Sequence, residues 1–225
     1  MEEQARGYAS ELFLRIGDEK RGRIIAAAVE EFAAFGYTGA NVNRIAQAAE
    51  ISVGALYKYF AAKEDLFMYI VEYEAAIMAD FIGGILAEDI RFLSKLEKLL
   101  RLAQEYSKRD PNLIRLYSVF TSEHDSGRAE ALAQRIEGVT ARAYYELIAG
   151  AQQRGEVRQD IDAQILAFML DNQLMAMQYS FACPYYQKRF SLFLGERNAK
   201  DNEHVIRCIM KGLQSMMQRI TCSLS

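Results

Sequence analysis

The chain has 225 residues, which suits one or two domains, and 51% of them are apolar, so a packed core is expected and intrinsic disorder is excluded. The formal net charge of −3 excludes a protein that is basic over its whole surface, so any nucleic-acid contact must come from a local patch. The three cysteines lack metal-ligand spacing, and we find neither a signal-peptide pattern nor an apolar run long enough for a membrane span. We therefore expect a cytoplasmic protein without a metal.

Strong helix formers dominate the chain and proline occurs twice, which predicts an all-α fold. Residues 1–17 are expected to form an arm or a loosely attached first helix. A well-signalled helix starts at Asp18, because apolar residues then recur at three- and four-residue spacing up to Phe35. Gly36 is expected to end this helix as a left-handed cap, with Tyr37 packing back.

Two very short helices are predicted next, and they are the centre of the functional hypothesis. Asn41 and Ser52 are good N-caps for them. Their inward-facing residues are expected to be Val42, Ile45, Ala46, Ala49, Leu56 and Phe60. Gly54 and Ala55 keep the second helix thin near its start, so that its backbone can approach a partner closely.

Longer helices follow in the remainder of the chain. One is expected from about Lys63 until Gly83-Gly84 ends it, and another begins at Asp110-Pro111. The other expected helices span 89–108, 128–154, about 160–182 and 201–220, while 185–200 carries no clear pattern. The change from short to long helices near Glu64 predicts two domains, 1–63 and 64–225.

The chemistry of residues 41–63 favours insertion of the second short helix into the major groove of DNA, which admits one α-helix. Tyr57, Tyr59 and Lys63 can donate to phosphates, and Lys58 can reach a phosphate or a guanine. Val53 and Ala55 are apolar and can contact only a thymine methyl group, so sequence selectivity would depend on Lys58, Asn43 and DNA shape. The amides at the start of the helix near Lys63 also form a natural anion site. The alternative is that these are two ordinary amphipathic helices of an α-helical protein.

The pattern Phe32-x3-Gly36-Tyr37, Val42-x2-Ile45-Ala46, Ala49, Ile51-Ser52-x-Gly54-x-Leu56-Tyr57-x-Tyr59-Phe60-x2-Lys63-x2-Leu66 resembles the DNA-binding domain of the tetracycline-repressor (TetR) family of transcriptional regulators. The resemblance covers about residues 20–66. It implies a three-helix DNA-binding domain with a helix-turn-helix, followed by a larger helical ligand-binding and dimerisation domain. It also implies groove-facing roles for Asn43, Val53, Ala55 and Lys58, and phosphate roles for Tyr57, Tyr59 and Lys63. Glu50 departs from the family because glycine is frequent in this turn, and a non-glycine residue in a left-handed conformation costs about 1 kcal/mol.

The resemblance further implies a homodimer that releases DNA when a small molecule enters the C-terminal domain. For the dimer seam we select the helices 162–182 and 201–220, with ordinary intramolecular core as the alternative for the latter. Aromatic residues and methionines suggest an apolar ligand pocket, and Asn172 is a polar residue that needs a partner if it is buried. The pocket candidates are Tyr106, Tyr117, Phe120, Tyr144, Phe168, Met169, Asn172 and Met175. The alternative is that they are core residues.

These expectations combine into a ligand-responsive regulator, a repressor by preference, which binds a palindromic operator as a homodimer. A helical small-molecule- or lipid-binding protein without DNA binding is the alternative. We do not expect an enzyme or a cofactor, because the sequence has no glycine-rich phosphate loop, no Ser/His/Asp order and only two histidines.

Overall fold

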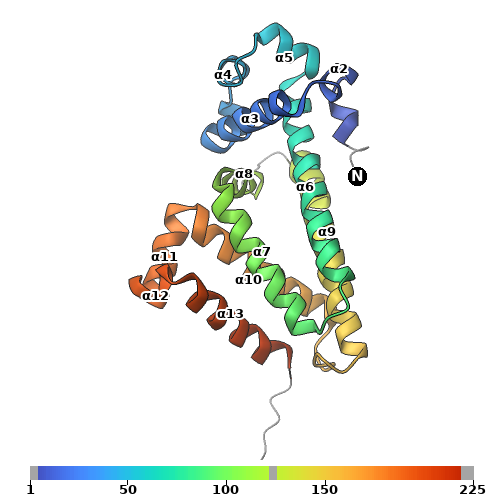
Figure 1. The fold of residues 1–225 in the computed structure, drawn as a ribbon, viewed down its shortest axis with the longest axis vertical. Coiled ribbons are helices and arrows are strands. Elements are labelled where there is room, and N and C mark those ends of the chain that lie inside the picture. Colours follow the sequence, from blue (N-terminus) through green and yellow to red (C-terminus); the bar gives the residue numbers. More distant parts are fainter. Residues whose placement is uncertain (1–4, 122–125, 219–225) are drawn as a thin grey trace, which may run out of the picture. The chain divides into compact units, whose positions relative to one another are not determined.

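A computed structural model of the chain describes residues 5–121 and 126–218. Within these residues the regular elements are helices and no strand is present, which confirms the predicted all-α fold. In chain order (Figure 1) the elements are the 3-10 helix η1 (Arg6–Tyr8) and the α-helices α2 (Glu11–Leu14), α3 (Asp18–Gly39), α4 (Val42–Ala48), α5 (Val53–Tyr59), α6 (Lys63–Ala87), α7 (Phe92–Arg109), α8 (Pro111–Thr121), α9 (Ser126–Gln153), α10 (Ala163–Ala182), α11 (Pro184–Leu194), α12 (Glu196–Lys200) and α13 (Asn202–Met217).

The chain divides into two compact units. The first comprises Met1–Ala79 and Asn112–Glu137, and the second comprises Asp80–Pro111 and Gly138–Ser225. Helices α6 and α9 each contribute residues to both units, because the division falls inside them. The boundary after residue 63, by contrast, follows the change in helix length along the sequence, and it stays a prediction.

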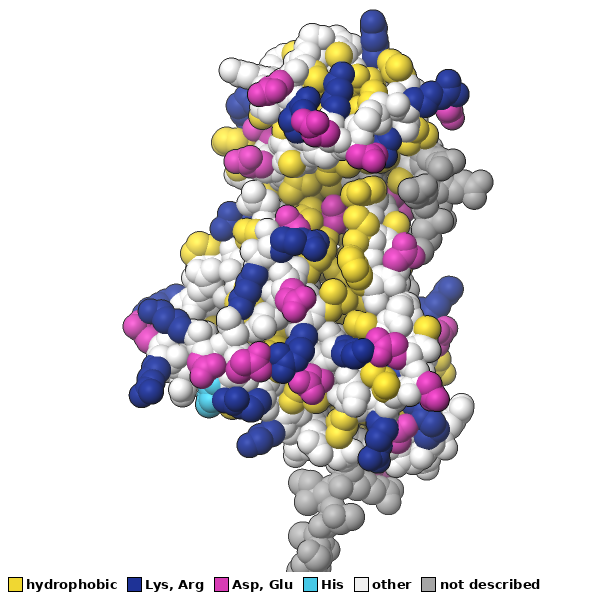
Figure 2. Space-filling model, in the orientation of Figure 1, with side chains coloured by type: hydrophobic (Ala, Val, Ile, Leu, Met, Phe, Trp, Pro, Cys, Tyr) yellow, Lys and Arg dark blue, Asp and Glu magenta, His cyan; other side chains and the backbone are white. Residues whose placement is uncertain are grey.

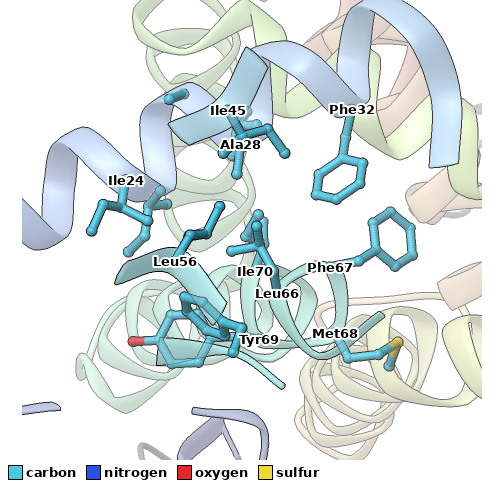
Figure 3. Close-up of a cluster of buried hydrophobic side chains, with 14 of the residues drawn as sticks. Ile24, Ala28, Phe32, Ile45, Leu56, Leu66, Phe67, Met68, Tyr69 and Ile70 are labelled. Atoms are coloured by element: carbon cyan, nitrogen blue, oxygen red, sulfur yellow. The ribbon is translucent and has the colours of Figure 1, made fainter. Parts of the chain in front are cut away.

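The core of the first unit joins α3 to the two short helices and to the start of α6 (Figure 3). Ile24 and Phe32 of α3, Ile45 of α4 and Leu56 of α5 are all fully or almost fully buried. The ring of Phe32 meets the edge of Phe67 of α6 at a centroid separation of 5.0 Å. Each buried side chain of this size stabilises the folded state by about 1.5–3 kcal/mol. The core therefore keeps the two short helices folded, although helices of this length are unstable in isolation.

The N-terminal segment is part of this core, which corrects the expectation of a loosely attached arm. Phe13 of α2 has no exposed surface and packs against Tyr59, Phe60 and Tyr69, with ring centroids 4.6–5.6 Å apart. The amide of Ser10 also donates to the carbonyl of Tyr59 at 2.9 Å. Phe13 and the Ser10 amide thus attach the segment to α5 and α6, and contacts of this kind leave no periodic signal in the sequence.

Helix α3 is interrupted where the sequence predicts its end. Gly36 has φ 68° and ψ 174°, a positive φ that favours glycine, although its ψ differs from that of a left-handed helical cap. Tyr37 then packs back as expected, since its ring stacks on Phe32 and meets the edge of Phe67 at 5.0 Å.

Helix α6 continues through Gly83 and Gly84 to Ala87, so the prediction that these glycines end it is wrong. Neither glycine has a positive φ, and a Cβ at either position would lie in open space. Glycine ends a helix by adopting a left-handed conformation, and the cost of a helical glycine alone, about 1 kcal/mol, is too small to break a 25-residue helix.

In the second unit, α7 packs against α10 and α13, and α10 packs against α11. Arg101 of α7 bridges Glu97 in its own helix and Glu203 of α13, at 2.9 and 2.8 Å. The carboxylate of Glu156, after α9, accepts a hydrogen bond from the Phe92 amide at 2.8 Å and so caps the start of α7. The last helix ends at Met217, three residues before the prediction, and Ile220 lies outside the described residues.

Candidate nucleic-acid interface

Helices α4 and α5 begin at the predicted caps. The Asn41 side chain accepts from the Asn43 amide at 2.8 Å, and the Ser52 hydroxyl accepts from the Ala55 amide at 3.1 Å. Such bonds satisfy amides of the first helical turn, which lack the i−4 carbonyl partner of a regular helix. Helices of seven residues are unstable alone, so these caps and the buried faces together define the pair.

The turn between the two helices is a Schellman motif. Glu50 adopts φ 57°, the amide of Ile51 donates to the carbonyl of Ala46 at 3.0 Å, and the amide of Glu50 donates to the carbonyl of Gln47 at 3.1 Å. The left-handed conformation that the sequence suggested at Glu50 is thus present, and a side chain occupies a position that suits glycine.

Three of the predicted DNA-contacting residues are exposed on these two helices. Asn43 of α4 and both Tyr57 and Lys58 of α5 are exposed, with 51% of Tyr57 accessible. Lys58 makes no hydrogen bond or ion pair with any described residue, so its ammonium group is available to a partner. A Cβ added at Gly54 would meet no atom within 4 Å, so the backbone of α5 is open on this side.

Val53 and Ala55 lie at the start of α5 and are half-buried against the core of the first unit. Their methyl groups therefore offer only part of their surface to a partner. These two side chains can contact a thymine methyl group but form no hydrogen bond to a base edge.

Tyr59 points inward, unlike Tyr57. Only 6% of it is exposed, its ring contacts Phe13, and the Lys20 ammonium lies 5.5 Å from its ring centroid. Because Tyr59 is three residues after the buried Leu56, helical spacing places both on one face. A phosphate contact from Tyr59 would have to come from its hydroxyl.

The Lys63 ammonium group is hydrogen-bonded to backbone carbonyl groups of the protein itself. Its ammonium group lies 2.7 Å from the carbonyl oxygen of Tyr37 and 3.1 Å from that of Ala40, with a third carbonyl, of Thr38, at 3.4 Å. It also lies 4.7 Å from the centroid of the Tyr37 ring. The predicted anion site beside it is partly occupied too, because the Asp65 carboxylate accepts from the Ala62 amide at 3.0 Å.

An ion pair between the buried Glu31 and the partly exposed Arg44 joins α3 to α4, and it was not predicted from the sequence. Glu31 is buried and accepts from Arg44 at 2.5 and 2.8 Å and from the Asn41 amide at 2.8 Å. Burial by itself raises the pKa of Glu31, but the hydrogen bonds from Arg44 and Asn41 outweigh it and hold the pKa below its ordinary value. A signal was present: Glu31 lies seven residues after Ile24 and three after Ala28, on the buried face of α3, where a carboxylate needs a cationic partner.

The residues proposed for a ligand pocket are distributed over both units. Tyr117 and Phe120 belong to the first unit, where the Tyr117 hydroxyl donates to the Glu137 carboxylate, and the other candidates belong to the second. Tyr106 and Tyr144 are buried, and Met175 is half-buried. The side chain of Phe120 lies outside the described residues.

Three other pocket candidates lie on α10 and differ in exposure. Phe168 is 68% exposed and Met169 is exposed as well. Asn172 is half-buried, and its side-chain amide donates to the carbonyl of Phe168 in the same helix at 2.7 Å. The polar partner that Asn172 needs is therefore provided by its own helix.

Two polar groups inside the second unit were not singled out from the sequence. The Nε2 atom of Gln104 on α7 is buried and has no hydrogen-bond partner among the described residues. Asp171 of α10 accepts from Thr140 of α9, and burial raises the pKa of its carboxyl group in spite of that bond. Such groups are costly in an apolar interior and are where a polar atom of a ligand or water would bind.

The face drawn in Figure 2 carries basic and acidic side chains interspersed, without a large area of one sign. Within residues 5–121 and 126–218, no group of three or more His, Cys, Asp or Glu side chains is arranged to hold a metal ion. No described helix is long and apolar enough to cross a membrane.

Comparison with known proteins places these features in context. Residues 24–70 match the family described as bacterial regulatory proteins, tetR family. The HTH-type transcriptional regulator RutR of Escherichia coli (strain K12) is 31% identical over 156 residues, which cover 67% of this chain and 70% of RutR. The HTH-type transcriptional repressor SCO4008 of Streptomyces coelicolor is 28% identical over 157 residues, covering 67% of this chain and 73% of SCO4008.

Solved structures share the fold over most of the chain. The fatty acid degradation regulator FadR from Bacillus halodurans superposes with a TM-score of 0.71 at 20% identity and covers 88% of this chain and 99% of that one. The transcriptional regulator FadR from Bacillus subtilis, solved in complex with stearoyl-CoA, gives a TM-score of 0.66 at 18% identity over 88% and 99% of the two chains. At these identities the likeness shows a common fold.

Proposed function

The chain belongs to the tetR family of bacterial transcriptional regulators, and from this premise we propose that it is a ligand-responsive repressor that binds a palindromic operator as a homodimer. The observation that carries the proposal is the exposure of Asn43, Tyr57 and Lys58 on two capped helices that each bury another face in the core. An arrangement of this kind presents polar groups to a groove on a rigid support.

We assign these residues distinct roles. Lys58 binds a phosphate or the O6 and N7 atoms of a guanine, and the Tyr57 hydroxyl binds a phosphate. Asn43 reaches the groove edge from α4. Val53 and Ala55 contact thymine methyl groups to the limited extent that their half-burial permits. Tyr59 contributes its hydroxyl at most.

Helix α10 is the proposed seam of the homodimer. Ile165, Phe168 and Met169 recur at three- and four-residue spacing and are exposed by 54, 68 and 38%. Side chains of this size are expected to be covered in the working assembly. The apolar stripe of α13 contributes less to the proposed seam, because Val205, Ile206, Leu213 and Met217 are buried within their own unit.

The proposed effector is a small lipophilic molecule bound in the C-terminal domain, for which we retain residues 64–225. The buried Tyr106 and Tyr144 and the half-buried Met175 favour an apolar ligand. The Gln104 Nε2 atom, which has no partner among the residues that the structure describes, and the carboxyl group of Asp171 offer polar contacts in the same unit. An effector need only bind the DNA-incompetent conformation more tightly to release the operator.

The test begins with selection of operators from random duplex DNA by the wild-type protein. Binding of the selected duplex is then measured against salt concentration for wild type and Lys58→Ala. If each Lys58 of the dimer binds one phosphate, the slope of log affinity against log salt decreases by about 1.8, since each phosphate contact contributes about 0.9. Lys200→Ala, an exposed lysine on α12, is the matched control and should leave the slope unchanged.

Two results would contradict the proposal. If no duplex is selected while apolar molecules bind, the chain is a helical small-molecule- or lipid-binding protein. If Lys58→Ala and Lys200→Ala behave alike, α5 is not the element that contacts DNA.

A further inference from the structure

The end of α3 is held by cations from two other helices. Tyr37, Thr38 and Gly39 form the last turn of α3 after the interruption at Gly36, and Ala40 is its C-cap, so their carbonyl groups lie at a helix end, where no following turn supplies donors. Lys63, the first residue of α6, approaches three of them, and Arg44 of α4 donates to the fourth, that of Gly39, at 3.1 Å. All of these residues belong to the first unit.

The ammonium group of Lys63 matches this cluster of carbonyls in number and shape. An ammonium group has three N–H donors, and three carbonyl oxygens lie 2.7–3.4 Å from it. The Tyr37 ring, 4.7 Å away, adds a cation–π contact. A positive charge is also favoured at the C-terminal end of a helix. A planar guanidinium group would not present its donors to three oxygens in this arrangement.

We infer that Lys63 is a positioning residue: it fastens the start of α6 to the end of α3 and so fixes the orientation of the α4–α5 pair, instead of contacting DNA. Arg44 makes the corresponding link on the other side, because it joins the same end of α3 to α4 through Glu31 and Gly39. A movement of α6 is thereby transmitted to α3 and α4 through hydrogen bonds to adjacent carbonyl groups. Lys58 supplies the free cation that a phosphate contact requires.

This inference rests on the proposed function wherever it concerns DNA, but the link itself is testable without DNA. Hydrogen–deuterium exchange reports on the amides of Ala40 and Asn41, which donate to the Gly36 carbonyl at 3.1 Å and to the Glu31 carboxylate at 2.8 Å. We expect exchange in residues 38–44 to accelerate about tenfold in Lys63→Met, the scale of losing hydrogen bonds to a charged group. Lys63→Arg should accelerate it as well, and Lys58→Met should not.

DNA binding then separates positioning from phosphate contact. With a selected operator, Lys63→Met and Lys63→Arg should both weaken binding about tenfold or more while the salt slope stays that of the wild type. Both variants should also discriminate less between this operator and one with a base pair inserted between its half-sites. A role in stability alone would not change that discrimination, provided that circular dichroism shows both variants folded at the assay temperature.

The outcomes are distinct. Wild-type affinity in Lys63→Arg, together with a salt slope reduced by about 1.8 in Lys63→Met, would establish a phosphate contact and overturn the inference. Unchanged exchange in residues 38–44 of both Lys63 variants would overturn it independently. If the wild type selects no duplex, the proposed function fails, and the exchange experiment still decides whether Lys63 holds α3.

Discussion

Replacing Glu50 by glycine should stabilise the protein. Glu50 is the residue of the helix-turn-helix turn that adopts φ 57°, and its exposed carboxylate makes no hydrogen bond or ion pair with any described residue. A side chain in a left-handed conformation costs about 1–2 kcal/mol, and the greater freedom of glycine in the unfolded chain returns about 0.5–1 kcal/mol of that. Glu50→Gly should therefore raise the free energy of unfolding by about 0.5–1 kcal/mol.

The measurement is thermal and urea unfolding of three proteins: wild type, Glu50→Gly and Glu50→Ala. A gain of about 1 kcal/mol raises Tm by about 2–4 °C in a protein of this size. Alanine removes the carboxylate but keeps the Cβ atom, so Glu50→Ala should remain within about 0.5 kcal/mol of wild type, the scale of a surface charge near a helix end.

The difference between the glycine and alanine variants isolates the backbone strain. Equal stabilisation by both would assign the effect to the carboxylate and refute the reasoning from φ. A destabilised Glu50→Gly would show that the turn is not held in the left-handed conformation. Because both variants lose the same negative charge, they should bind a selected operator equally well, and a difference would indicate that the turn itself has moved α5.

Three further predictions follow. Phe13→Ala should lower the free energy of unfolding in urea by about 3–5 kcal/mol, because it empties a fully buried site, and a loss below about 1 kcal/mol would restore the loosely attached arm. Since burial raises the pKa of the Asp171 carboxyl group, the free energy of unfolding should fall as pH rises from the ordinary pKa of aspartate through the raised one. Asp171→Asn should flatten this part of a plot of Tm against pH, and a plot identical to that of the wild type would contradict the prediction. Phe168→Glu should convert dimers to monomers in light scattering, whereas Leu192→Glu, on the equally exposed Leu192 of α11, should not, and a dimeric Phe168→Glu would exclude the proposed seam.

The parts of the fold that depend on neighbours in sequence were predictable. Asn41 and Ser52 cap α4 and α5 as expected, because a cap and the amide that it accepts from are two or three residues apart. Gly83 and Gly84 misled the prediction, because what ends a helix is the left-handed conformation, and residue type only makes that conformation easier. The roles of Tyr57 and Tyr59 were also separable in principle, since only Tyr59 repeats the spacing from the inward-facing Leu56.

The partners of Lys63 were beyond the reach of local pattern. The carbonyl groups that it binds lie 23–26 residues earlier in the chain. Every residue has a carbonyl group, so nothing in residues 37–40 marks them as acceptors for this lysine. A lysine near the recognition helix and a lysine that fastens that helix to its support look alike in sequence. They differ only in whether the fold brings backbone carbonyl groups within hydrogen-bonding distance of the ammonium group.

The exposure of Phe168 changes the argument about the effector. A side chain that is 68% exposed, as Phe168 is, has little surface left to line a pocket inside the same chain, and Met169 is exposed by 38%. If both belong to the dimer seam, the aromatic and sulfur-containing candidates left for a pocket in the second unit are Tyr106, Tyr144 and Met175, while Gln104 and Asp171 supply hydrogen-bonding groups that were not predicted from the sequence. A pocket of this composition favours an apolar effector that carries at least one hydrogen-bonding atom over a pure hydrocarbon chain, because an unpaired buried amide is costly and a ligand oxygen would satisfy it.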